Sequence, residues 1–170
     1  MKINYLIDQL EMNREVMLAL LSDVSTELII YKPSPQSWNL LEIICHLIDE
    51  EKEDFRLRVK HVIEYPETTP PSIDPVSWVM SRNYLDQDFG KKLKEWDVER
   101  KKSIREMKEL APTCNFNSGF DHPTFGRMTA YFFLRNWIAH DYLHIRQITR
   151  NKYQFLEMME NRDVSYAGRW

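Results

Sequence analysis

The sequence predicts an all-α protein, a four-helix bundle, and three observations support this. Apolar residues recur at helical spacing in four long segments of the 170-residue chain. The chain has four glycines, too few for the tight turns of a β-sandwich or barrel. Prolines gather where helical patterns stop, above all between residues 66 and 75. Helices of roughly 20–25 residues favour a bundle, and the length fits one domain over residues 1–170.

The composition is that of an ordinary globular protein, with 43% hydrophobic and 29% charged residues. The formal net charge of −3 argues against a nucleic-acid partner, since such proteins usually carry a basic face. No segment reaches the roughly 18 consecutive apolar residues of a membrane span. Acidic residues interrupt the N-terminal region where a signal peptide needs an apolar run. The two cysteines are far apart and make no disulfide framework. We therefore expect a cytoplasmic protein with no membrane partner.

The first helix is predicted from about Ile3 to Leu28. Apolar residues recur there every three or four positions, and acidic residues occupy several of the positions between them. Pro33 and Pro35 follow the last apolar repeat. Proline interrupts helical hydrogen bonding, so the segment after the first helix is predicted to be a loop.

The second helix is predicted from Asn39 to about Ile63. Asn39 is a favourable N-cap, and Glu42 three positions later completes the pattern of a capping box. Apolar residues at helical spacing continue the pattern. Four prolines follow between residues 66 and 75, which predicts a long irregular connection. Such a connection is either a crossover between distant helix ends or part of the rim of a site.

The third helix is predicted to begin near Asp86 or Asp88 and to stop before Pro112. Arg100 occupies a position on its apolar stripe where an apolar residue would be expected. Two interpretations remain open at this stage. The arginine stem lies along apolar surface with its charge in water, or the charge points into a polar pocket inside the bundle.

The fourth helix is predicted from Thr129, a suitable cap, to about Arg150. A short fifth helix is expected around residues 155–160. Patterns typical of β-strands are weak throughout the chain.

Two histidines lie on the inward face of the fourth helix. His140 and His144 are four residues apart, on the stripe that also carries Trp137 and Ile148. This spacing lets two imidazoles reach one metal ion. The alternative is a pair of hydrogen-bonded core histidines, because this spacing also arises by chance.

A third histidine favours the metal. His46 lies on the inward side of the second helix, and three imidazoles without partners in a helical core would be costly. Binding to one cation would remove that cost. Three imidazoles and a water form a familiar open site for zinc or nickel. The sequence therefore predicts one divalent transition metal, Zn or Ni, held by His46, His140 and His144.

Several other polar residues accompany these histidines. Glu50 lies one turn beyond His46 on the same face, and it is a candidate fourth ligand, catalytic base or outer partner, or else a solvated acid. Asp141 is rotated about 100° from its neighbour His140, which favours a salt bridge over ligation. His61 and His122 lie near predicted loops and are interpreted as surface or structural residues.

Three segments resemble the DinB-like (damage-inducible) superfamily. SWNLLEIICHLIDEE resembles its helix-two motif, and DHPTFGRMTAYFFLRNWIAHDYLHIRQITR resembles its second motif with the HDxxH pair. WDVERKKSIREMKEL resembles its third helix, with Arg100 at a recurrent arginine. Tyr166 and Trp170 are similar to an aromatic pair that ends many members.

The resemblance implies an up-down-down-up four-helix bundle with a long crossover between helices two and three. It also implies a homodimer and a nickel or zinc ion at the positions of His46, His140 and His144. Similar proteins include thiol S-transferases that use bacillithiol, mycothiol or glutathione, and others described as metal-dependent hydrolases.

Two classes of function follow from this resemblance. The leading hypothesis is an enzyme in which the metal activates a small-molecule thiol that attacks an electrophile, with Glu50 or Arg100 orienting an anionic part of the thiol. In the hydrolase alternative a water attacks a hydrolysable substrate, and Glu50 is the base. The second class is a non-catalytic, metal-stabilised binding or stress-response module. An open coordination site beside a solvent-connected pocket favours an enzyme, whereas a sealed site favours a structural ion.

Overall fold

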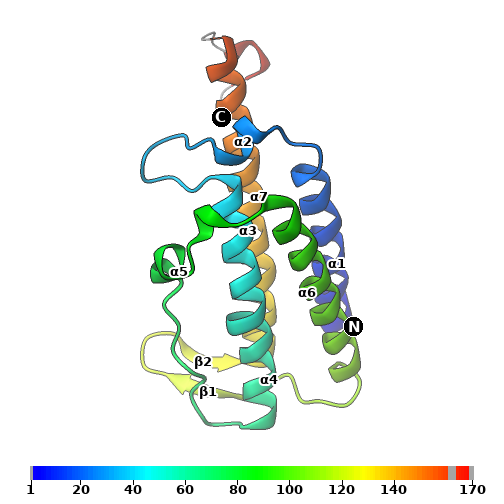
Figure 1. The fold of residues 1–170 in the computed structure, drawn as a ribbon. Coiled ribbons are helices and arrows are strands. Elements are labelled where there is room, and N and C mark those ends of the chain that lie inside the picture. The colour runs from blue at the N-terminus through cyan, green and yellow to red at the C-terminus, as the bar shows by residue number, and fades with distance from the viewer. Residues whose placement is uncertain (1, 161–163, 169–170) are drawn as a thin grey trace.

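Four long helical units form the bundle in the computed structural model, which describes residues 2–160 and 164–168. They are α1 (Lys2–Leu21), the continuous unit α3 (Leu40–Asp49), η1 (Glu50–Phe55) and α4 (Arg56–Glu64), then α6 (Phe89–Leu110) and α7 (Ala130–Glu160). Figure 1 shows α1 and α7 running in one direction and the other two units running in the opposite direction. The predicted up-down-down-up four-helix bundle is confirmed.

The connection between α4 and α6 is the crossover that this topology requires. In Figure 1 it runs from the end of the bundle near the hairpin back to the other end. It carries α5 (Pro75–Ser81) and the short 3-10 helix η2 (Tyr84–Asp86), so it is less irregular than the prolines suggested. Asp74 caps α5 through the amide of Ser77, and Pro75 occupies the first turn, where a missing N–H costs nothing.

The second helical unit begins as predicted and contains a feature that was not predicted. The amide of Glu42 donates to Asn39 Oδ1 and the amide of Asn39 donates to Glu42 Oε2, both at 2.9 Å, which confirms the capping box. Residues 50–55 then form the π-helix η1 within the unit. Short π-helical segments inside α-helices are frequent at functional sites.

Two helix boundaries differ from the prediction. α1 ends at Leu21, and residues beyond it form the separate short helix α2 (Thr26–Ile30), because Asp23 adopts a left-handed backbone with φ of 53° and Ser25 caps α2. α7 continues to Glu160 without the predicted break near Arg150. No glycine or proline interrupts residues 151–160, and α7 is anchored there by Asn151, whose side chain donates to Trp38 O at 2.9 Å.

The small antiparallel hairpin before α7 was not predicted, because strand patterns in the sequence are weak. Strand β1 (Gly119–His122) pairs with β2 (Gly126–Thr129) in the register Gly119↔Thr129. A Cβ on Gly119 would lie 2.2 Å from the carbonyl oxygen of Met128, so only glycine allows this close approach. The side chain of Thr129 accepts from the amide of Phe132 at 3.0 Å, as expected for the cap of α7.

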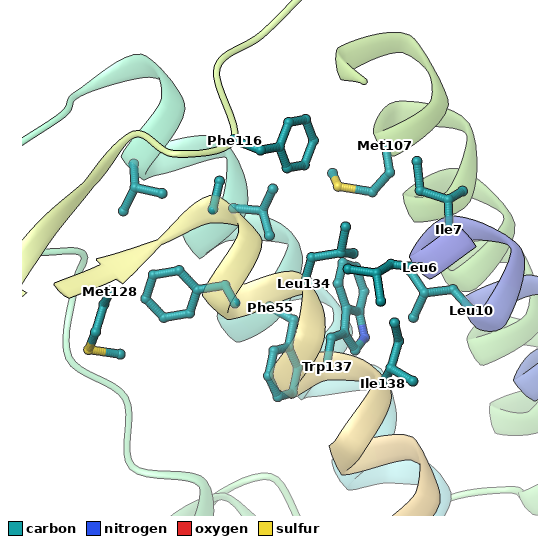
Figure 2. Packing of buried hydrophobic residues seen from close by; sticks show 14 of the residues in the cluster. Leu6, Ile7, Leu10, Phe55, Met107, Phe116, Met128, Leu134, Trp137 and Ile138 are labelled. Atoms are coloured by element: carbon teal, nitrogen blue, oxygen red, sulfur yellow. The ribbon is translucent and has the colours of Figure 1, made fainter. Parts of the chain in front are cut away.

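The apolar interior consists of two clusters at opposite ends of the bundle. Figure 2 shows part of the first, in which residues from α1, α6 and α7 pack around Trp137 and Phe55. The second cluster is built mainly from α3, with Met17, Trp96 and Ile148 contributed by the other helices. Along each of the four helical units, buried polar or charged residues separate the residues of the first cluster from those of the second. The clusters therefore bracket a polar layer that contains His140 and His144, whereas His46 lies among the apolar residues of the second cluster on α3.

Within residues 2–160 and 164–168, the helices are too short or too polar to cross a lipid bilayer. Tyr166 belongs to the short 3-10 helix η3 (Ser165–Ala167), whereas Trp170 lies outside the described residues.

Candidate metal centre

Three imidazole rings converge where α3 meets α7. Nε2 of His46 lies 3.3 Å from Nε2 of His140, which lies 3.1 Å from Nε2 of His144. In the described part of the chain, these three side chains form a group whose ligand atoms lie within 4.8 Å of one another. The structure therefore brings together the three residues that the sequence predicted as ligands.

These separations fit a single metal ion. Two nitrogens bound at about 2.0–2.1 Å to a tetrahedral ion are about 3.3–3.4 Å apart, close to the 3.1 and 3.3 Å observed. Hydrogen bonds explain the arrangement less well, because one imidazole nitrogen carries one proton or offers one lone pair. Nε2 of His140 therefore cannot make good hydrogen bonds to both neighbours. One cation would satisfy all three nitrogens.

The protonation states also suit a metal. His144 Nδ1 lies 2.9 Å from Gln147 Oε1, so the ring donates its N–H to the amide oxygen and leaves Nε2 with a free lone pair. Burial, followed by repulsion from neighbouring histidines, lowers the pKa of His46 to about 3 and that of His140 to about 2. Burial also lowers the pKa of His144. All three rings are neutral near pH 7, the form that binds metal.

Aromatic side chains enclose the three rings. The Trp38 ring lies 4.8 Å from the His46 ring, centroid to centroid, and is nearly parallel to the His144 ring at 6.5 Å. On the other side, the Phe55 ring lies 5.1 Å from the His140 ring. Nδ1 of His46 is buried with no hydrogen-bond partner in the structure, so the ring is oriented by its aromatic neighbours and by the contact of its Nε2 with His140.

Glu50 lies one helical turn after His46, with its backbone N–H donating to His46 O, and it is buried, so it is not a solvated acid. It lies in η1 and is 5% exposed. Its carboxyl group hydrogen-bonds with Asp54, and burial, followed by the negative charge of Asp54, raises the pKa of Glu50 to about 8. Its carboxylate does not join the converging ligand atoms of the described residues. Burial and the neighbouring negative charge therefore favour the protonated form of Glu50.

Arg100 forms a buried ion cluster in the polar layer. Its Nε donates to both oxygens of Glu51 at 2.9 Å, and its two terminal nitrogens donate to Asp141 at 2.7 and 2.8 Å. Asp141 also accepts from Asn13, and Glu51 accepts from Trp137 Nε1 at 3.3 Å. The cluster thereby connects α1, η1, α6 and α7.

The interpretation of Arg100 as an arginine with its charge in water is wrong, because its side chain is 1% exposed. The alternative, a charge directed into a polar interior, describes it better. The predicted salt-bridge role of Asp141 matches the structure. A catalytic role for Arg100 stays a prediction, and its bonds to two carboxylates fit a positioning role better than contact with a substrate.

Comparison with protein families gives a match to the model of the DinB superfamily over residues 9–148, which include all three converging histidines. This chain belongs to the DinB superfamily.

Solved structures agree with the four-helix-bundle fold. YfiT from Bacillus subtilis, described as a probable metal-dependent hydrolase with an unusual four-helix bundle topology, matches with a TM-score of 0.78 at 18% identity, over 90% of this chain and 87% of that one. TT2238, described as a four-helix bundle protein, matches with a TM-score of 0.56 at 14% identity, over 87% of this chain and 98% of that one. At such identities the likeness establishes the fold alone. Comparison with curated proteins gives no significant match.

Four residues around the three histidines were not assigned a role at the metal site from the sequence. Trp38 covers two of the rings, and Gln147 orients His144. Glu51 and Asn13 complete the ion cluster. Gln147 lies one turn after His144 on the same helix face, so spacing alone could have indicated it. The other three act through contacts between helices, which spacing does not reveal.

The remaining two histidines of the chain make hydrogen bonds to residues near them in sequence, which fits their interpretation as surface or structural residues. His61 Nε2 lies 2.9 Å from Thr68 Oγ1. His122 Nδ1 accepts from the amides of Thr124 and Phe125 in the hairpin turn.

Proposed function

We propose that this protein is a metal-dependent enzyme, and specifically a thiol S-transferase that joins a bacillithiol- or glutathione-type thiol to an electrophilic small molecule. The observation that carries the proposal is the convergence of three neutral imidazoles beside a cavity lined in part by His140. A zinc or nickel ion held there would act as a Lewis acid and lower the pKa of a thiol or water beside it. The S-transferase assignment itself rests on the family resemblance, which does not determine function.

The cavity distinguishes this proposal from a purely structural ion. A volume of about 380 Å³ adjoins His140, within the usual range of small-molecule sites. A metal that only stabilised the fold would need no such space. The cavity therefore supports a site that binds a small molecule over an ion that only stabilises the fold.

The raised pKa of Glu50 supports a role for this residue in proton transfer. Burial favours the protonated form of Glu50, so for an electrophile whose bond to oxygen breaks, such as an epoxide, Glu50 would donate a proton to that oxygen as the carbon–sulfur bond forms. The proton lost by the thiol would then restore Glu50. Above pH 8 its carboxylate would instead accept a proton from water, as the hydrolase alternative requires. The description of YfiT as a probable hydrolase favours keeping that alternative.

A thiol panel tests the proposed function. We expect zinc- or nickel-loaded protein to accelerate conjugation of a low-molecular-weight thiol to chlorodinitrobenzene, and His46→Ala to remove the acceleration. The rate should rise with pH and level off below about 8.5, the pKa of a free thiol, because the metal would lower the pKa of the bound thiol. Metal-dependent cleavage of esters or amides without any thiol conjugation would favour the hydrolase. No turnover in either assay would favour the binding module.

The raised pKa of Glu50 predicts a pH-dependent stability of the metal-free protein. The pKa of about 8 exceeds the ordinary value of 4.5, so the folded state favours the protonated acid. The stability that protonated Glu50 contributes to the folded state is fully present below pH 4.5 and is lost as the pH rises through 8. Glu50→Gln should therefore match the wild type at pH 5 and exceed its unfolding free energy by about 1–2 kcal/mol at pH 9, after allowance for partial solvent screening.

Urea unfolding at the two pH values, in the presence of a chelator, measures this difference. Equal stability of wild type and Glu50→Gln at pH 9 would mean that Glu50 titrates normally.

A further inference from the structure

The cavity beside His140 has a strongly apolar wall. Phe132, Phe133 and Leu143 of α7 line one side of it, and Phe55 of η1 lines another. Phe125 and Met128, from the hairpin, complete the wall. Figure 2 shows Met128 and Phe55 on the side of the hydrophobic cluster away from α1. The hairpin, which has no counterpart among the predicted elements, thus contributes to the cavity.

The polar groups at the cavity are already bound to other groups of the protein. Arg58 forms an ion pair with Asp54. Asn136 donates through Nδ2 to the carbonyl oxygen of Phe132 at 2.8 Å. Moving a charged or sugar-like ligand into such a cavity would cost desolvation energy that these groups could not offset. An apolar ligand would bind favourably by burying its surface against the apolar side chains of this wall.

The cavity is connected to the candidate metal centre through His140. This residue lines the cavity, and its Nε2 is shared by both short contacts within the histidine cluster. The Phe55 ring lies 5.1 Å from the His140 ring and 5.7 Å from the Trp137 ring, so it borders both the cavity and the polar layer. A ligand in the cavity would therefore lie beside the ion that the three histidines fit.

We propose that this cavity binds a neutral aromatic group of the electrophilic substrate and holds its reactive part beside the metal centre. That the ligand is a substrate rests on the proposed function. Binding of an aromatic group in the cavity does not depend on catalysis. It predicts selection of aryl over small alkyl or charged substrates. Leu143 is the residue best suited to test it, since it lines the cavity yet is 53% exposed, so a charge there should not disrupt the fold.

The test compares two hydroxamic acids on zinc-loaded protein by calorimetry. Benzohydroxamate and acetohydroxamate share a metal-binding group and differ in a phenyl versus a methyl group. Burial of the ring should make the wild type bind benzohydroxamate at least about tenfold more tightly. Leu143→Glu should bring the two affinities to within about twofold. Leu156→Glu is the matched control: Leu156 is also on α7, is 57% exposed and does not line the cavity, so the preference should remain.

A second measurement uses the neutral dye phenylnaphthylamine, which fluoresces in apolar sites, on metal-free protein. The dye should bind the wild type and the Leu156→Glu variant alike, and Leu143→Glu should weaken its binding at least about tenfold. If the metal centre fails, the hydroxamates will not bind but this dye result will persist. If only the proposed activity fails, the dye and hydroxamate results will both persist while the thiol panel shows no turnover. The proposal is overturned if the dye does not bind, or if it binds both glutamate variants equally.

Discussion

Replacing His140 with alanine should abolish retention of a divalent ion while leaving the helical circular dichroism largely intact. Nε2 of His140 lies within 3.3 Å of the corresponding nitrogens of both other histidines, so its loss removes the central ligand. Losing an outer partner of a ligand already costs 10–100-fold in metal affinity. We therefore expect a loss of more than about 100-fold, measured by competition with a chromogenic chelator.

Thermal melting provides a second readout of the same variant. An ion bound only to the folded state raises the melting temperature, so chelator should lower the melting temperature of the metal-loaded wild type and not that of His140→Ala. His61→Ala is the matched control, because His61 lies on α4 and contacts Thr68 instead of the other histidines. Equal metal retention by His140→Ala and His61→Ala would contradict the assignment.

Replacing Arg100 with methionine should produce the largest loss of stability among single substitutions in the polar layer. The guanidinium lies between the carboxylates of Glu51 and Asp141, with all three side chains at most 1% exposed. Removing one partner of a buried ion pair costs about 3–5 kcal/mol, because the remaining charge stays buried without compensation. Urea unfolding should therefore show a loss of this size for Arg100→Met.

Two further variants make the result specific. Lys101→Met removes an adjacent charge whose side chain is 58% exposed, and it should change the unfolding free energy by less than about 1 kcal/mol. Combining Arg100→Met with Glu51→Gln and Asp141→Asn removes the unpaired charges and should recover part of the lost stability. A similar small loss for Arg100→Met and Lys101→Met would mean that the cluster does not stabilise the fold.

Much of the fold could be predicted from the sequence because its main determinants are local. The capping box at Asn39 involves residues three positions apart, and the prolines after residue 64 act on their own backbone. The prolines predicted a long connection, and the family resemblance, not their position, indicated that this connection is a crossover. The π-helix was not predictable in this way, because the polar run at residues 50–55 is equally compatible with an α-helix.

The candidate site was predictable only in part, for the same physical reason. Helical periodicity places His140 and His144 on one face, and an inward His46 provides the third ring. The environment of Arg100 depends instead on carboxylates from two other helical units, which the pattern of its own helix does not contain. The enclosing ring of Trp38 is a tertiary contact of the same kind.

The ion cluster also explains the orientation of His140. Successive residues on a helix point about 100° apart, so holding Asp141 toward Arg100 and Asn13 directs His140 toward α3. Arg100 would then influence the metal centre through the orientation of α7. Loss of metal affinity in Arg100→Met, beyond that caused by partial unfolding, would be the signature of this coupling.

X-ray absorption at the zinc edge of zinc-loaded protein tests most directly whether His46, His140 and His144 bind one ion. The account predicts one zinc per chain and three imidazole nitrogens at about 2.0–2.1 Å, with one imidazole fewer in His144→Ala if that variant retains any zinc. An oxygen-only coordination shell, or an unchanged spectrum in the fully loaded His144→Ala variant, would contradict it.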